Sequence, residues 1–347
     1  MLPTLGYAAH HATTPLIPFS FSRRDVGPHD VLIQIRYCGM CHSDLHQVRN
    51  EWGGSIYPMV PGHEITGTVA QVGAEVRAFV VGDSVGVGCF VDTCRMCPAC
   101  RRGEEQYCDG HLAWTYNGYE RDQRTPTYGG YSNQIVVDAR YVVRIPVGLS
   151  LDRAAPLLCA GITTYSPLAH WKVGRGHRLA VVGLGGLGHM AVKFGAALGA
   201  HVTVLSRSNG KRPDALRLGA SYFSTLDTDL SKLERAFDFL LDTVSAPHAI
   251  DPLVELLTTD GTFILVGAPD RPLEVGAMPL ILRRRRLAGS LIGGIRATQE
   301  MLDFCATQGI AADVEVIPIQ QVNDAYERML AGDVRYRFVI DLASLSG

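Results

Sequence analysis

Four cysteines lie within one short segment of the chain, at Cys94, Cys97, Cys100 and Cys108. The two-residue spacers let successive thiolates turn toward one centre, and the longer last spacer lets the chain return with a fourth. Four thiolates suit a closed tetrahedral zinc site, which is structural because no position is left for a substrate. An iron–sulfur cluster is the alternative, since ferredoxin segments also use two-residue spacers. In bacterial ferredoxins a proline follows the fourth cysteine, whereas Pro98 follows the second here, so zinc is favoured.

A second constellation combines Cys41 with His63. A thiolate and an imidazole are good zinc ligands, and a catalytic zinc commonly takes three protein ligands and keeps a fourth position open. Asp44 could orient His63 by accepting the N–H of its second ring nitrogen. A histidine near a turn is more often a satisfied polar residue than a ligand. Spacing does not reveal a third ligand, because ligands meet in space rather than in sequence.

A glycine-rich turn follows the short apolar segment 178–182. The turn matches the pattern G-x-G-x-x-G, and an apolar helix over 188–198 is expected after it. Strand, turn and helix in that order predict a dinucleotide site, in which the pyrophosphate lies at the helix N-terminus. The alternative is a helix that simply begins after a strand, without a ligand. The candidate residues are Gly183, Leu184, Gly185, Gly186, Leu187 and Gly188.

The residues after the next expected strand, 201–205, favour NADP(H) over NAD(H). An NAD site would place Asp or Glu there, about 20 residues after the first glycine, to hold the ribose 2′-hydroxyl. This chain instead offers hydroxyls and cations, which suit a 2′-phosphate. These residues are Ser206, Arg207, Ser208, Lys211 and Arg212. The alternative is that they form only the solvated start of a helix.

The elements that must position these residues change in character along the chain. Short β segments with turn residues between them predict a small, mostly β domain before residue 150, at 31–38, 65–72, 84–91 and 134–137. An alanine-rich helical stretch then runs from Leu151 to Trp171. Strands alternate with helices beyond it and predict a parallel, doubly wound sheet, with later strands at 237–241, 262–266 and 287–291. The tail mixes helices and strands, at 298–307, 314–317, 322–331 and 337–340.

Length and composition narrow the class of protein. The chain has 347 residues, of which 47% are hydrophobic and 19% charged, which predicts about two domains and excludes a disordered chain. Its net charge of −2 argues against general binding of nucleic acid or anionic membranes. No apolar run reaches the ~18 residues that cross a bilayer, and no export signal is evident, so we expect a cytoplasmic protein. Nine cysteines in a reducing compartment indicate metal rather than disulfides. The run Arg283–Arg286 is interpreted as a solvated face.

Taken together, these motifs resemble the zinc-dependent medium-chain alcohol dehydrogenases. The resemblance is to the cinnamyl-alcohol-dehydrogenase-like branch, which includes bacterial broad-range NADPH-dependent aldehyde reductases. It covers nearly the whole chain and includes the cysteine segment. The other matching motifs are CGMCHSDLH (38–46), PGHEITGTVAQVG (61–73), GDSVGVG (82–88), GGYSNQIVV (129–137), LLCAGITTYSPL (157–168), GLGGLGHMAVKF (183–194) and AGSLIGG (288–294).

The resemblance implies roles that spacing does not supply. It implies that Cys159 is the third ligand of a catalytic zinc, beside Cys41 and His63. Glu64 would be a nearby carboxylate that coordinates this zinc in some states. Ser43 and His46 match the proton-relay positions of the family, and with Asp44 they form the implied catalytic set.

Further positions are implied for the cofactor and the substrate. Thr163 matches a cofactor-contacting position, as do Leu291, Ile292 and Gly293. Trp52 and Trp114 fall where this branch shapes its substrate pocket, although core packing explains them almost as well. Arg207 stands where relatives often carry a small hydroxyl residue, a departure that strengthens the preference for a 2′-phosphate.

The implied fold combines α/β and β parts. A GroES-like β-barrel catalytic domain would span 1–151 and 290–347, and a Rossmann doubly wound parallel-sheet domain would be inserted over 152–289, with the active-site cleft at the junction. The implied activity is reversible, zinc-dependent reduction of aldehydes to primary alcohols by hydride transfer from NADPH. Ser43, a cofactor ribose hydroxyl and His46 would supply the proton. Two zinc ions per chain, NADP(H), a small aldehyde or alcohol substrate and a homodimer through the Rossmann sheet edges are expected.

Three alternatives stay open. The chain could oxidise alcohols with NAD. It could be a zinc-free quinone reductase of the same superfamily, but such a protein would lack the ligands found here. It could also be a zinc-knuckle binding protein on a dehydrogenase-like scaffold, with a macromolecular partner. The intact glycine turn beside a complete ligand set argues against this last alternative, as does the lack of a basic composition.

Overall fold

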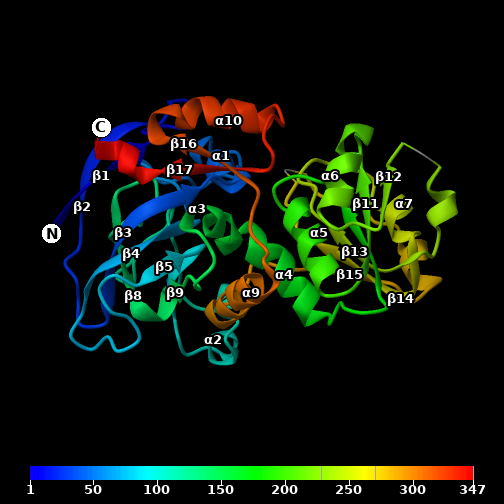
Figure 1. The fold of residues 1–347 in the computed structure, drawn as a ribbon, viewed down its shortest axis with the longest axis horizontal. Helices are drawn as coiled ribbons and strands as arrows, with labels where there is room; N and C mark the ends of the chain where they lie inside the picture. Colours follow the sequence, from blue (N-terminus) through cyan, green and yellow to red (C-terminus); the bar gives the residue numbers. More distant parts are fainter. Residues whose placement is uncertain (228, 270, 347) are drawn as a thin grey trace. The chain divides into compact units, whose positions relative to one another are not determined.

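The computed structural model describes residues 1–227, 229–269 and 271–346. The chain forms two compact units, the first built from Met1–Ile162 and Gly293–Gly347 and the second from Thr163–Ile292. Figure 1 shows this discontinuity in colour, because the first unit combines blue and cyan segments with orange and red ones. The expected joins were at 151/152 and 289/290. The contacts of the structure instead place residues 152–162 in the first unit and residues 290–292 in the second.

The main sheet of the first unit has the order β16-β17-β3-β4-β5-β9, with β8 also paired to β3, among the described residues. Its neighbours are antiparallel except for β16 and β17, which run parallel. Val31, Ile33 and Ile35 alternate along β3 and are buried, so one face of this strand faces the core. The strands are β3 (Asp30–Gly39), β4 (Ile65–Val72), β5 (Ser84–Val87), β8 (Gln134–Asp138), β9 (Val143–Arg144), β16 (Val314–Pro318) and β17 (Arg337–Asp341).

The tail of the chain completes this sheet. Strand β17 pairs antiparallel with β3, with Ile340 opposite Cys38. In Figure 1 the red β17 accordingly lies with the blue β3. The first unit therefore needs both ends of the chain, which explains why the tail returns to strands after the second unit. The helices of the first unit include α1 (His42–Val48), α2 (Pro98–Arg102), α3 (Leu151–Ala154), α9 (Ile295–Gln308) and α10 (Val322–Leu330).

Two features of the first unit differ from the expected elements. The segment 84–91 is not one strand, because β5 ends at Val87 and a second strand, β6 (Phe90–Thr93), pairs with β7 (Leu112–Trp114). The switch occurs where Thr115 donates hydrogen bonds to the carbonyl oxygens of Gly88 (2.5 Å, from Oγ1) and Cys89 (3.0 Å, from N). A hairpin of β1 (Leu2–Ala8) and β2 (Ile17–Arg23) was not expected.

The helical stretch expected over 151–171 is interrupted. Helix α3 is followed by a 3₁₀ turn over Ala155–Leu158, and α4 (Ala160–His170) begins only after Cys159. Cys159 itself has non-helical dihedrals, with φ −130° and ψ −69°. The interruption places this thiol between two helical segments rather than on a continuous helix face.

The second unit contains a parallel sheet with the order β12-β11-β10-β13-β14-β15 in the part of the chain that the structure describes. This is the doubly wound order, which reverses between β10 and β13 and so creates the place where such folds bind ligands. The strands are β10 (Arg178–Val182), β11 (His201–Ser206), β12 (Tyr222–Thr225), β13 (Phe237–Asp242), β14 (Leu257–Leu265) and β15 (Arg286–Gly289). The helices are α5 (Gly188–Ala197), α6 (Arg212–Arg217), α7 (Asp251–Val254) and α8 (Ala277–Ile281), besides most of α4.

The arginine run is only partly the solvated face that the sequence suggested. Arg284 pairs with Asp260 at the surface. Arg285, in contrast, donates to the carbonyl oxygens of Leu257, Pro279 and Glu255, at 2.9, 2.9 and 3.0 Å. Adjacent residues of the run therefore point in different directions, and one of them stabilises the fold.

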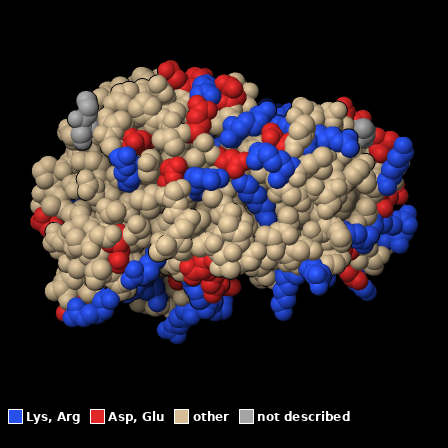
Figure 2. All heavy atoms as spheres, in the orientation of Figure 1, with Lys and Arg blue, Asp and Glu red and all other residues tan. Residues whose placement is uncertain are grey.

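Charge and hydropathy of the structure can be described briefly. Among the described residues, none of the helices is both long and apolar enough to cross a membrane. Acidic and basic side chains are interspersed over the face shown in Figure 2.

Candidate functional site

The four clustered cysteines converge in the loop between β6 and β7. Their sulfur atoms all lie within 4.8 Å of one another. Backbone N–H groups donate to three of the sulfurs: Cys97 N to Cys94 Sγ (3.4 Å), Cys100 N to Cys97 Sγ (3.5 Å) and Cys94 N to Cys108 Sγ (3.4 Å). Hydrogen bonds from the backbone of Met96 and Cys97 lower the pKa of Cys94 to about 6. A set of four sulfurs, turned inward and supported by N–H donors, fits a tetrahedral zinc ion.

The surrounding side chains fix this loop to the first unit. Thr93 Oγ1 accepts from the thiol of Cys100 (3.3 Å) and lies 2.8 Å from the hydroxyl of Tyr141. Arg95 donates two hydrogen bonds of 2.8 Å to Asp92 and one of 3.0 Å to Asp138. The sequence spacing predicted the cysteines but gave no indication of this supporting network.

The structure also brings together the second candidate ligand set. Cys41, His63, Glu64 and Cys159 each offer an atom within 4.8 Å of the others. Cys41 precedes α1, His63 and Glu64 precede β4, and Cys159 lies between α3 and α4. The sulfurs of Cys41 and Cys159 are 4.0 Å apart although 118 residues separate them in sequence. Two thiols and an imidazole are the donor chemistry of a catalytic zinc site.

Asp44 holds these residues in place. It is fully buried, and its Oδ1 lies 3.0 Å from His63 Nδ1. The same carboxylate accepts from the backbone N–H groups of Cys41 (2.9 Å) and Gly62 (3.1 Å). Burial alone lowers the pKa of His63, but the charge of Asp44 raises it well above its ordinary value. Because Nδ1 is engaged by Asp44, Nε2 is the ring nitrogen that remains for a metal.

Glu64 forms a buried ion pair with Arg337 of β17. The contact uses Glu64 Oε1, while Oε2 is buried and has no hydrogen-bond partner among the described residues. Burial raises the pKa of Glu64 to about 7, and Arg337 opposes that shift. An unpartnered buried carboxylate oxygen beside two thiols and an imidazole fits a cation there. Sequence reasoning missed Arg337, although a lone arginine in the apolar strand RFVID was a signal for it.

The candidate relay residues lie on α1. The thiol of Cys41 donates to Ser43 Oγ at 3.6 Å, so this hydroxyl adjoins the ligand set. His46 Nδ1 contacts the carboxylate of Glu51, a residue that the sequence analysis did not single out. The ring of Trp52 stacks on His46, with centroids 4.9 Å apart and planes at 30°. Trp52 is 41% exposed and Trp114 36%, so neither is a core residue.

A third thiol also adjoins the second ligand set. Cys89 belongs to none of the motifs predicted from the sequence, but its thiol lies beside Cys159. The thiols of Cys41 and Cys89 together raise the pKa of Cys159 well above its ordinary value. Only the fold brings this residue close, because the strand that the sequence suggested breaks at Gly88–Cys89.

The glycine turn of the second unit lies between β10 and α5. Gly183 has φ +87°, and a Cβ at Gly188 would meet the carbonyl oxygen of Gly183 at 2.1 Å, so both positions require glycine. A Cβ at Gly185 would meet nothing within 4 Å, which leaves this backbone open toward a ligand. Leu184, Gly186 and Leu187 complete the turn. The arrangement fits a pyrophosphate at the start of α5.

The candidate 2′-phosphate residues follow β11, which is a neighbour of β10 in the sheet. Ser206 ends this strand and is buried, while Arg207 and Ser208 are exposed. Lys211 donates from Nζ to the carbonyl oxygen of Leu184 at 2.8 Å, so this cation reaches the glycine turn. A cation and two hydroxyl residues beside the turn fit a second phosphate group.

The remaining predicted cofactor residues are placed by the topology. Leu291 and Ile292 follow the carboxyl end of β15, which is the sheet edge that also carries the glycine turn, because all the strands are parallel. Thr163 is a buried residue of α4. Gly293 is the first residue of the returning part of the first unit.

Comparisons with known proteins agree with this organisation. Residues 27–147 match the alcohol dehydrogenase GroES-like domain, and residues 186–307 match the zinc-binding dehydrogenase family. The chain is 57% identical to NADP-dependent alcohol dehydrogenase C 1 of Mycolicibacterium smegmatis over 98% of both chains. It is 54% identical to aldehyde reductase YahK of Escherichia coli, over 97% of this chain and 98% of that one. A solved cinnamyl alcohol dehydrogenase of Sorghum bicolor superposes with a TM-score of 0.95 at 49% identity, over 98% of each chain.

The buried ion pair leads to a prediction about stability. Replacing Arg337 by Ala leaves the Glu64 charge buried without its partner, so we expect a loss of about 3–5 kcal/mol in the free energy of unfolding. Arg36→Ala is the matched control, because Arg36 of β3 pairs with Asp341, which lies on β17 like Arg337, but is partly exposed. This control should cost about 1 kcal/mol or less. Urea unfolding of both variants measures the difference, and equal losses would contradict the role assigned to Arg337.

Proposed function

Because the chain belongs to the zinc-dependent medium-chain alcohol dehydrogenase family, we propose that it reduces aldehydes reversibly to primary alcohols with NADPH as hydride donor. The observation that carries this proposal is the convergence of Cys41, His63 and Cys159 in a chain that also has an open glycine turn. The names of the similar proteins support the direction and the cofactor, since they include an aldehyde reductase and an NADP-dependent alcohol dehydrogenase. Two zinc ions per chain follow from the two ligand sets.

The protein's own residues have separable roles in this reaction. When bound, zinc supplies a Lewis acid for the carbonyl oxygen and NADPH supplies the hydride. Cys41, His63 and Cys159 hold the metal, and Asp44 fixes the orientation of His63. Glu64 is an additional carboxylate at the same centre, held by Arg337. The cysteines of the β6–β7 loop form a closed structural site, because all four positions are occupied by protein sulfur.

Proton transfer is assigned to α1. The Ser43 hydroxyl, which adjoins Cys41, gives its proton to the oxygen of the substrate. His46 restores that proton, and its partial exposure connects it with solvent. Glu51 holds the Nδ1 atom of His46, which leaves Nε2 for the transfer.

NADP(H) is favoured over NAD(H) by the residues after β11. Arg207, Ser208 and Lys211 offer cations and a hydroxyl, and the segment 206–212 contains no acid to hold a 2′-hydroxyl. Lys211 is directed toward the glycine turn by its bond to Leu184. Alcohol oxidation with NAD is therefore less favoured. The ligand set disfavours a zinc-free quinone reductase, and the glycine turn disfavours a zinc-knuckle binding protein.

Assembly and location complete the proposal. Strand β15 is an edge of the parallel sheet, and the neighbouring α8 segment exposes Met278, Ile281 and Leu282 by 56%, 68% and 68%. An edge strand beside exposed apolar side chains suits a homodimer through this edge, which a monomeric mass in sedimentation would contradict. None of the nine cysteines forms a disulfide in the structure, which suits a reducing cytoplasm, and cell fractionation tests that location.

The activity itself is tested by assaying aldehydes with NADPH and with NADH, alongside the zinc content of the same preparation. We expect turnover of an aryl and an aliphatic aldehyde with NADPH, and two zinc ions per chain. Activity with NADH alone would overturn the cofactor assignment. A zinc-free protein that still turned over substrate would overturn the metal assignment.

Arg207→Ala tests the assignment of the 2′-phosphate site. Hydrogen bonds to charged groups contribute about 1.5–3 kcal/mol, so we expect the Kd of NADPH to rise roughly 10–150-fold while that of NADH stays unchanged. Lys232→Ala is the control, because it removes an exposed cation of the same unit that lies outside the segment following β11. Fluorescence titration of both cofactors measures the effect. A parallel loss of NADPH and NADH affinity would show that Arg207 supports the fold rather than the phosphate.

Ser43→Ala tests the proton relay. Positioned proton transfer contributes typically about 10²–10⁴-fold, so kcat should fall by that order while NADPH affinity and zinc content stay unchanged. Ser43→Thr keeps a hydroxyl at the same position and should retain most of the activity. Unchanged turnover in Ser43→Ala would remove Ser43 from the mechanism.

A further inference from the structure

Two aromatic side chains cover the two histidines of the candidate site, and they come from different loops. Trp52, in the loop that follows α1, stacks on His46 with centroids 4.9 Å apart. Tyr116, in the segment after β7, stacks on His63 with centroids 5.8 Å apart and planes at 24°. Each histidine is therefore covered by an aromatic ring from one of these two loops.

Asn117 joins the two loops through its side-chain amide. Its Oδ1 accepts from the backbone N–H of Ile56 at 2.8 Å, and its Nδ2 donates to Gln47 Oε1 at 2.7 Å. Gln47 adjoins His46 on α1, and Ile56 lies four residues after Trp52. A backbone N–H can only donate, so the partners fix which amide atom is the oxygen. Ser55 strengthens the junction by donating from Oγ to the carbonyl oxygen of Gln47 at 2.5 Å.

The backbone of Asn117 adds a second requirement. Its φ is +54°, in the left-handed region where asparagine is among the best-tolerated residues after glycine. Glycine would satisfy the backbone but supply no amide. Aspartate would keep an acceptor for Ile56 N but could not donate to Gln47 while ionised. Asparagine meets both requirements at once.

Each of the two loops has attachments that do not involve this amide. The segment around Tyr116 has its own attachments, from Thr115 N to the Cys89 carbonyl oxygen (3.0 Å) and from Gly118 N to Thr127 Oγ1 (3.1 Å). The loop after α1 is attached to the helix itself, from Ser55 Oγ to the Gln47 carbonyl oxygen (2.5 Å) and from the Tyr57 hydroxyl to the Val48 carbonyl oxygen (2.7 Å), while Gly53 and Gly54 have positive φ and open surroundings. Loss of the amide should therefore free the Trp52 loop from the Tyr116 segment, while each keeps its attachments to its own neighbours.

We propose that Asn117 is a positioning residue that sets aldehyde specificity, because it holds the Trp52 loop against the segment that carries Tyr116. The proposal rests on the proposed function, since it takes His46 and His63 as residues of the aldehyde site. With the amide present, the Trp52 ring that covers His46 is held in place before the substrate binds. Without the amide, a large substrate must order the Trp52 loop as it binds, whereas a small substrate that does not reach Trp52 is unaffected.

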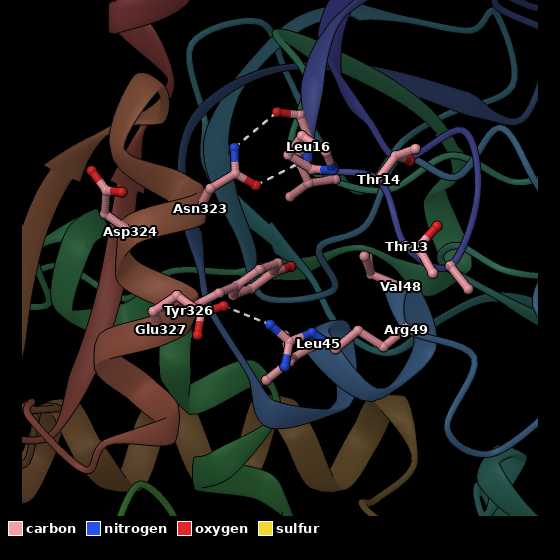
Figure 3. A pocket seen from close by; sticks show the side chains of 12 residues that line it. Thr13, Thr14, Leu16, Leu45, Val48, Arg49, Asn323, Asp324, Tyr326 and Glu327 are labelled. Carbon is pink, nitrogen blue, oxygen red and sulfur yellow. Dashed lines mark hydrogen bonds and ion pairs between the residues drawn. The ribbon is translucent and has the colours of Figure 1, made fainter.

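A matched control exists elsewhere in the same unit. Asn323 of α10 also makes two amide hydrogen bonds to another segment, accepting from Leu16 N and donating to the Leu16 carbonyl oxygen, both at 2.9 Å. Figure 3 shows this pair beside a cavity. The cavity has a volume of about 470 Å³ and is also lined by Leu45 and Val48 of α1 and by Arg49, which follows the helix. Asn323 and Asn117 thus each join two segments through a side-chain amide. Asn323, however, joins α10 to the N-terminal loop and contacts neither of the loops that cover the histidines.

Hydrogen exchange tests the structural half of the proposal without any catalytic assay. In Asn117→Gly the amide of Ile56 should exchange faster, and that of Leu16 should not change. In Asn323→Gly the pattern should reverse, because Leu16 N loses its acceptor. Asn117→Asp keeps the acceptor and should protect Ile56 nearly as well as the native residue. Unchanged exchange of Ile56 in Asn117→Gly would overturn the proposal, whatever reaction the protein catalyses.

Kinetics test the functional half, with benzaldehyde as the bulky substrate and acetaldehyde as the small one. In Asn117→Gly the KM of benzaldehyde should rise roughly tenfold, the scale expected for losing two neutral hydrogen bonds, while the kinetics of acetaldehyde, the Kd of NADPH and the zinc content stay unchanged. Asn323→Gly should change neither KM. A rise in Ile56 exchange with no change in the KM of benzaldehyde would overturn the specificity role. Absence of aldehyde reduction in the unmodified chain would instead refute the proposed function.

Discussion

The buried carboxylate of Asp44 is the interaction on which the candidate ligand set of the first unit depends. It is fully removed from solvent, and its charge is balanced by the backbone N–H groups of Cys41 and Gly62 and by the ring of His63. A buried charge is tolerated only when such partners surround it. The same three contacts join the start of α1 to the turn before β4. The group that orients His63 is therefore also the group that holds the two chain segments of the ligand set together.

A second buried charge extends this arrangement to the end of the chain. Glu64 follows His63, and its partner Arg337 comes from β17, 273 residues later in sequence. The pairing of β17 with β3 delivers that arginine, since β3 is also the strand that leads to α1. The C-terminal segment thus contributes a residue to the candidate site as well as a strand to the sheet. The insertion of the second unit between these strands leaves their pairing intact, because the chain returns to the same sheet.

The second unit carries the glycine turn and most of the candidate cofactor residues rather than the candidate metal ligands. Its strands are short, apolar and parallel, so their carboxyl ends share one edge, where the order reverses between β10 and β13. Glycines let the backbone turn there without side chains, and Lys211 returns to the turn from the neighbouring segment. The candidate metal ligands therefore belong to the first unit, and the candidate cofactor residues, apart from Gly293, belong to the second.

Features that depend only on residues close together in the chain could be predicted from the sequence. The two-residue cysteine spacers, the strand–glycine turn–helix order and the missing acid after β11 are all read within about 20 residues, where geometry follows from chain connectivity. The doubly wound sheet followed for the same reason, because alternating strands and helices admit few arrangements. Family resemblance, rather than spacing, supplied Cys159 and the relay residues.

The folded structure was needed to show the contacts made between segments far apart in the sequence. It placed Cys89 beside Cys159, Arg337 beside Glu64, and Glu51 and Trp52 around His46. The expected strand is interrupted at Gly88–Cys89, where side-chain and backbone hydrogen bonds redirect the chain. The expected helix is interrupted at Cys159, whose thiol lies in the candidate ligand set. Asn117 illustrates the reason, since nothing around it in sequence indicates that Gln47 and Ile56 lie opposite its amide. Residue types and periodicity specify which groups a segment can offer, but packing of the whole chain selects their partners.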